Sequence, residues 1–189
     1  MNCVKLISNC FIRKQNSYKE TKHTQTSNTS SELQNEYPSY QQTKKLELSG
    51  TMKARLVKIY DGDTQTYVVK FNDTFYNVVI RIHGIDTPEL RSKNKVEIAR
   101  AVHARNRVFE IITGITVGLD DKGADLNKKL ESVPFYVTLI CQGTDKYGRQ
   151  LAIVNNWQGI DVGKQLLIER LALPYDGGKK PAFTQVESP

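Results

Sequence analysis

Residues 51–71 read TMKARLVKIYDGDTQTYVVKF, and their pattern sets the fold of the chain. Two runs rich in β-branched and aromatic residues flank the sequence Asp61-Gly62-Asp63-Thr64. Such runs are typical of strands, and Asp-Gly is strongly preferred in the tight turns of β-hairpins. The stretch therefore predicts two antiparallel strands that are joined at the DGDT turn.

Further short elements follow toward the C-terminus. FYNVVIRIHGI (75–85) predicts a third strand, and two more strands, VPFYVTLICQG (133–143) and RQLAIVNN (149–156), are predicted around the hairpin GTDKYG. Between the third and fourth of these strands, VEIARAVHARNRVFEIITG (96–114) carries apolar residues at helical spacing and ends at a glycine, which predicts a long helix. DVGKQLLIERLAL (161–173) predicts a short helix that the following proline stops.

Five short strands, linked mainly by hairpins and interrupted by one long helix, predict a mainly β, α+β fold. We expect a five-stranded OB-fold barrel with attached helices. The helices are too few for a doubly wound parallel sheet. We expect the barrel domain over residues 48–182 and a tail over 183–189. Residues 1–47 are expected to form a disordered polar arm, because much of this segment is rich in Ser, Thr, Asn and Gln without any period.

Net charge, hydrophobicity and cysteine content limit the kinds of partner and site that this chain can have. A net charge of +7 favours an anionic partner, nucleic acid first and an anionic membrane surface second. No apolar run approaches the ~20 residues of a membrane span. The three cysteines form no CxxC pair, so neither a disulfide framework nor a zinc site is indicated. Cys3 and Cys10 lie among basic residues, which leaves two alternatives open: peripheral membrane contact through an acylated arm, and an unmodified arm.

The stretch RIHGIDTPEL (81–90) concentrates residues that can do chemistry. Its proline cannot extend a β ladder, so the strand must end there in a rigid turn. We expect this turn to aim Asp86, the Thr87 carbonyl and Glu89 into one small region, close to Arg81 on the strand.

These residue types fit the hydrolysis of a phosphodiester bond. A hard cation such as Ca²⁺ takes oxygen ligands from carboxylates and backbone carbonyls, which Asp63, Asp86 and Thr87 can supply. Such a cation polarises a phosphoryl oxygen and holds water nearby. Glu89 is then placed to act as the general base for that water.

The second hairpin adds cations and an aromatic ring. Arg81 and Arg149 offer two-pronged donors for the non-bridging oxygens, whose charge grows in the transition state, and lysine does not match this geometry. Tyr147 can stack on a base, and Lys146 can neutralise a further phosphate.

Four motifs resemble those of the staphylococcal nuclease-like (thermonuclease) family. They are YDGDT (60–64), RIHGIDTPEL, TDKYGRQLA (144–152) and LALPYDGGKK (171–180), in that order. The resemblance covers about residues 53–180 and excludes the arm. It implies a calcium-dependent, sequence-nonspecific nuclease on an OB-fold barrel, which cuts DNA and RNA and leaves 3′-phosphate and 5′-hydroxyl ends.

The resemblance also implies roles for individual residues. The metal ligands of the family correspond to Asp63, Asp86 and the carbonyl of Thr87. Its general base corresponds to Glu89, and its two phosphate-gripping arginines to Arg81 and Arg149. Residues that contact the terminal phosphate or the base of a nucleotide correspond to Lys146, Tyr147 and Tyr175. The placement of Tyr175 stays open, because LALPYDGG has a proline and glycines where the staphylococcal enzyme continues toward another helix.

A non-catalytic module is the main alternative: the same barrel, used to bind nucleic acid or protein without cleavage. Degenerate members of the superfamily typically lose acids or arginines of the site, whereas this chain has all of them, which favours the enzyme. We expect a monomer whose partners are DNA and RNA, with single-stranded or locally melted segments preferred. An intracellular or membrane-tethered location is favoured over secretion, because the start of the chain has no convincing export signal.

Overall fold

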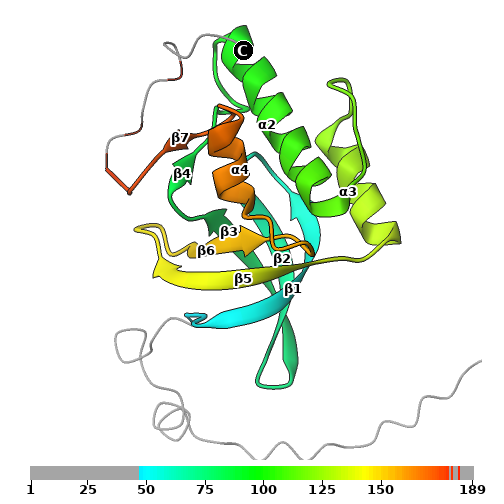
Figure 1. The fold of residues 1–189 in the computed structure, drawn as a ribbon, viewed down its shortest axis with the longest axis vertical. Coiled ribbons are helices and arrows are strands. Elements are labelled where there is room, and N and C mark those ends of the chain that lie inside the picture. Colours follow the sequence, from blue (N-terminus) through cyan, green and yellow to red (C-terminus); the bar gives the residue numbers. More distant parts are fainter. Residues whose placement is uncertain (1–46, 179, 181–182, 184–189) are drawn as a thin grey trace, which may run out of the picture. The chain divides into compact units, whose positions relative to one another are not determined.

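A computed structural model describes residues 47–178, 180 and 183 of the chain (Figure 1). The predicted arm, apart from its last residue, and most of the predicted tail lie outside these residues. Within the described part, no helix is long and apolar enough to cross a lipid bilayer.

Five strands close into a barrel in the order β1-β2-β3-β6-β5. Their bounds are β1 (Thr51–Ile59), β2 (Thr64–Phe71), β3 (Thr74–Ile82), β5 (Phe135–Thr144) and β6 (Gln150–Asn155). Neighbouring strands are antiparallel except for β3 and β6, which run parallel. This is an OB-fold barrel, and the predicted fold class is confirmed.

The hairpins follow from local turn chemistry. β1 and β2 are joined across the DGDT turn, as the sequence predicts. Between β2 and β3, Asn72 and Asp73 adopt φ angles of 46° and 61°, while Phe71 pairs with Thr74. Two central residues with positive φ are typical of the hairpin turn whose twist matches that of its strands, and Asn and Asp tolerate this conformation well.

The long helix forms where its apolar period predicts it. It is α2 (Lys95–Thr113), and it begins after Asn94, whose side chain accepts the N–H of Val96 at 2.9 Å. It ends at Gly114, which adopts the left-handed φ of 73° that favours glycine at this position. A second helix, α3 (Gly123–Ser132), is absent from the sequence prediction.

The predicted end of the last helix is wrong. This helix, α4, covers Val162–Ile168 and stops well before Pro174. Arg170 then adopts a left-handed φ of 56°, which turns the chain out of the helix. The following residues form β7 (Leu173–Pro174), which pairs antiparallel with β4 (Ile85–Asp86). This unpredicted pairing brings the C-terminal segment beside the RIHGIDTPEL strand.

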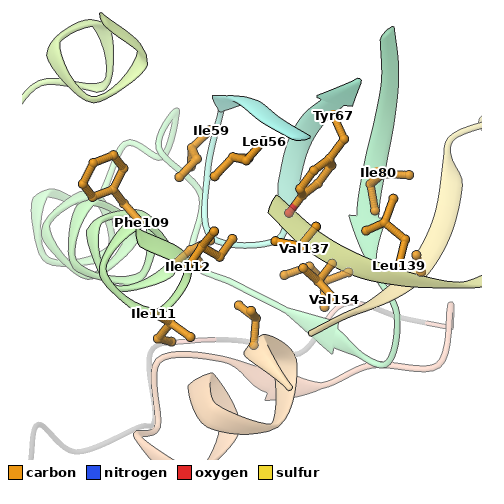
Figure 2. Packing of buried hydrophobic residues seen from close by; sticks show 14 of the residues in the cluster. Leu56, Ile59, Tyr67, Ile80, Phe109, Ile111, Ile112, Val137, Leu139 and Val154 are labelled. Carbon is orange, nitrogen blue, oxygen red and sulfur yellow. The ribbon is translucent and has the colours of Figure 1, made fainter. Parts of the chain in front are cut away.

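A hydrophobic core fills the barrel and the space between the barrel and α2 (Figure 2). The buried residues that Figure 2 labels are Leu56, Ile59, Tyr67, Ile80, Val137, Leu139 and Val154 from the strands, and Phe109, Ile111 and Ile112 from α2. Burying one large apolar side chain contributes about 1.5–3 kcal/mol. The core therefore holds the barrel and α2 as a firm support for the turns at the edge of the barrel.

Candidate active site

The DGDT turn is shaped by its own first acid. Asp61 Oδ1 accepts the N–H groups of Asp63 at 3.2 Å and of Thr64 at 2.8 Å. Such side-chain to backbone bonds fix a turn locally. Burial, followed by the nearby charge of Asp63, raises the pKa of Asp61 to about 7. Burial in this turn therefore favours the protonated form of Asp61 more than exposure to water would.

A glycine lets this turn lie against the next one. A Cβ built on Gly62 would be 2.8 Å from Thr87 Cγ2 and 2.9 Å from Ala104 Cβ on α2. These distances are shorter than real Cβ contacts, so no larger residue fits without a shift of its neighbours. Gly62 thus allows close approach between the turn that carries Asp63 and the turn that carries Asp86.

Arg81 joins the two acids. Its Nη1 donates to Asp63 Oδ2 at 2.6 Å, and its Nη2 donates to Asp86 Oδ1 at 2.7 Å. Nη2 also donates to the carbonyl of Ile85 at 3.2 Å. All three charged residues are buried, with exposed fractions of 5% for Arg81, 4% for Asp63 and 1% for Asp86. Although burial alone would lower the pKa of Arg81, the two carboxylates raise it above its ordinary value.

The acids have further partners that hold their orientation. Thr64 Oγ1 donates to Asp63 Oδ1 at 2.8 Å, and the N–H of Thr87 points to Asp63 Oδ2 at 3.4 Å. Because a buried ion pair that loses one partner leaves an uncompensated charge, such clusters are sensitive to single substitutions. Asp63, Asp86 and Thr87 therefore form one connected cluster, and their role as metal ligands stays a prediction.

Glu89 extends from the same turn and contacts Lys180, which is not among the predicted site residues. Its carboxylate accepts a hydrogen bond from Lys180 Nζ, which also lies 3.3 Å from Asp86 Oδ1. The side chains of Glu89 and Lys180 are 51% and 50% exposed, so both can move. The sequence offers little to single out Lys180, because it is one of two consecutive lysines after a pair of glycines. Only the tertiary fold brings it near the acids.

The β5–β6 turn is organised around Asp145. Its carboxylate accepts the N–H groups of Tyr147 and Arg149, each at 2.9 Å, and pairs with Arg149 Nε at 2.7 Å. Burial raises the pKa of Asp145, but these bonds outweigh burial and lower it below its ordinary value. The exposed ring of Tyr147 lies 5.7 Å from the Arg149 guanidinium and 5.2 Å from Lys146 Nζ.

The β4–β7 pairing fixes the position of Tyr175 in the fold. The N–H of Tyr175 donates to the carbonyl of Gly84 at 3.0 Å, and the centre of its ring lies 5.4 Å from the guanidinium of Arg81. The tyrosine hydroxyl donates to the carbonyl of Gly178 at 3.0 Å. Tyr175 therefore lies beside Arg81, which bonds both acids.

A pocket of about 470 Å³ brings the basic and aromatic residues together. The predicted residues that line it are Arg81, Lys146, Tyr147, Arg149 and Tyr175, and Lys180 joins them. Asp63, Asp86, Thr87 and Glu89 are not part of this lining. Asp63 and Asp86 adjoin the pocket through Arg81, and Glu89 adjoins it through Lys180. Thr87 is linked to it through its contact with Asp63.

The donor set at this edge fits a hard divalent cation in its chemistry. Two carboxylates and a backbone carbonyl are the oxygen ligands that Ca²⁺ prefers. The cluster has three carboxylates (Asp63, Asp86, Glu89) and two cations (Arg81, Lys180), one negative charge in excess. No group of three or more His, Cys, Asp or Glu side chains with metal-binding geometry occurs in the described part of the chain, so a cation here would rely on the carbonyl and on water as well.

Comparison with models of known protein families finds no match, and a search of curated proteins finds no significant relative.

Proposed function

We propose that this protein is a calcium-dependent nuclease of the staphylococcal type, which hydrolyses phosphodiester bonds of DNA and RNA without sequence preference. One observation carries the proposal: Arg81 holds Asp63 and Asp86 together at the edge of a pocket rich in cations and aromatic rings. The OB-fold supports it, because oligonucleotides are common ligands of this barrel.

The pocket has the composition expected of a site for single-stranded nucleic acid. Its lining includes four cations, Arg81, Lys146, Arg149 and Lys180, against two acids, Asp145 and Asp176. The Tyr147 ring is 72% exposed and provides a surface on which a base can stack. Each stacked base contributes about 1–3 kcal/mol and does so with little dependence on sequence. This matches an enzyme that accepts many sequences.

The two arginines would hold the phosphate that is cut. The bonds of Arg81 to Asp63, Asp86 and Ile85 use three of the five N–H donors of its guanidinium, which orients the group and keeps donors for a phosphate oxygen. Arg149 pairs with Asp145 through Nε, so the two terminal nitrogens stay outside that ion pair. Donors fixed in advance in this way stabilise charge as it develops in the transition state.

Glu89 would take the proton from the attacking water. Its carboxylate is half exposed and lies on the turn that directly follows Asp86, so water can reach it. Lys180 pairs with one of its two oxygens, Oε1, so the other oxygen lies outside that ion pair. A Ca²⁺ ion held by Asp63, Asp86 and the Thr87 carbonyl would polarise the phosphoryl oxygen beside this water.

The test is cleavage of single-stranded DNA by the purified full chain, with Ca²⁺ in one sample and a chelator in the other. We expect cutting only with Ca²⁺, with 3′-phosphate and 5′-hydroxyl ends on the products. The Asp63→Asn variant should be inactive, and Glu131→Gln, at an exposed site on α3, is the matched control that should stay active. Retention of DNA without cutting in both samples would contradict the proposal and favour the non-catalytic module.

A further inference from the structure

We infer that the outer face of the barrel carries a second binding site for single-stranded nucleic acid, in which a base stacks on Trp157. The site is a pocket of about 560 Å³ that is separate from the candidate active site. Its lining includes Lys53, Tyr136, Thr138, Asn155 and Trp157.

The barrel register places three of these residues in one row. Lys53 of β1 pairs with Thr138 of β5, which pairs in turn with Asn155 of β6. Their sequence neighbours Ala54, Val137 and Val154 are buried in the core. Because side chains alternate between the two faces of a sheet, the row lies on the outer face of the barrel.

Two large aromatic rings stand open to solvent at this row. Trp157 is 71% exposed and Tyr136 is 57% exposed, although both line the same pocket. Rings of this kind are stacking platforms for nucleobases, and the stacking tolerates any base because every base has a π-face. The rings therefore suit bases that have been freed from a duplex.

The polar groups of the pocket favour a phosphodiester strand over an uncharged saccharide. Lys53 is the one charged residue among the described residues that line it, so the pocket offers a cation and no acid. The net charge of +7 adds attraction for an anion. Asn155 Oδ1 has no hydrogen-bond partner within the described part of the chain, and such a group lowers its free energy when it gains a donor.

One strand of nucleic acid could span both pockets along β6. Arg149 comes just before β6 and Trp157 shortly after it, and six strand residues cover about 20 Å. Leu151 lines the first pocket and Asn155 the second, with the half-buried Ile153 between them on the same face. OB-folds bind about 4–16 nucleotides, which is enough to cover this distance. The idea that one strand runs through both pockets rests on the proposed function of the first pocket. Stacking of a base on Trp157 does not depend on cleavage.

The experiment uses Trp157 as its own reporter, because it is the single tryptophan of the chain. The full chain carrying Glu89→Gln is titrated, in chelator, with an oligothymidylate of about twelve nucleotides. We expect saturable quenching of tryptophan fluorescence. In the same background, Trp157→Ala should weaken binding of the fluorescein-labelled oligonucleotide about 5- to 150-fold, as loss of one stacked base predicts. The control Ile168→Ala removes a side chain that is 75% exposed on α4 and should leave binding unchanged.

The outcomes separate this inference from the proposed function. Absence of quenching, or unchanged affinity of a Trp157→Ala variant with a wild-type circular dichroism spectrum, would overturn the inference. Cleavage by the unmodified protein, measured in parallel, decides the proposed function independently. Quenching by a neutral oligosaccharide but not by oligothymidylate would also overturn the inference and assign the pocket to saccharides.

Discussion

Replacing Gly62 with alanine should loosen the contact between the two turns that carry the acids. The added Cβ would lie 2.8 Å from Thr87 Cγ2 and 2.9 Å from Ala104 Cβ, whereas carbon atoms are most stable about 3.5–4.0 Å apart. Overpacking of this kind costs about 1–3 kcal/mol. Each kcal/mol lowers the Tm of a domain of this size by about 2–4 °C, so we expect a fall of about 2–12 °C.

The same substitution should also lower the rate of DNA cleavage by a large factor, even at temperatures where the variant stays folded. Relief of the clash moves Asp63 away from Asp86, and a displacement of about 1 Å at a reacting centre can cost about 100-fold in rate. The assay combines thermal unfolding, followed by circular dichroism, with initial rates of DNA cleavage at a temperature where the variant is folded. Gly118→Ala is the matched control, since its Cβ would meet nothing closer than 3.8 Å. A Gly62→Ala protein with wild-type Tm and rate would refute the close contact between the two turns.

Three further predictions concern single side chains. Glu89→Gln should slow cleavage about 10²–10⁴-fold with the Tm unchanged, because the side chain is half exposed, and an undiminished rate would remove Glu89 from the mechanism. Arg149→Lys should lose most activity although it keeps the charge, whereas a rate like that of wild type would show that a point charge is enough. The third concerns pH. Hydrogen bonds from Arg107 lower the pKa of Glu169 in the folded protein below its ordinary value of 4.5. The ion pair therefore stabilises the fold fully above pH 4.5. This stabilisation is lost as the pH falls through the pKa that Glu169 has in the folded protein. The urea midpoint should therefore drop less between about pH 5 and pH 3 in Glu169→Gln than in wild type, and equal drops would contradict this assignment.

The local parts of the fold could be predicted from the sequence. The DGDT turn, the strand-forming runs on either side of it and the glycine that ends α2 are each encoded within a few residues. α3 was missed because its sequence, GADLNKKLES, has only two buried apolar residues, Leu126 and Leu130, four positions apart. Its burial depends on packing against β1, which no local pattern reveals.

The long-range parts could not be predicted. Pro174 looked like a helix stop, yet the helix ends at Ile168, and the proline belongs to a strand that pairs with residues about ninety positions earlier. That pairing is what brings Tyr175 to Arg81. The bonds of Arg81 to both acids, and the contact of Lys180 with Glu89, likewise exist only after the chain has folded. The sequence therefore predicts which residue types the candidate site contains, but not how they pair.

The most direct test of the central claim is a double-mutant cycle on the two acids that Arg81 joins. Calcium-dependent cleavage rates are measured for wild type, Asp63→Asn, Asp86→Asn and the double variant, with folding of each checked by circular dichroism. If the acids act as one unit, each single change should abolish most activity and the double variant should be no slower than the slower single variant. Rate losses that simply multiply, or a single variant as fast as wild type, would contradict the account.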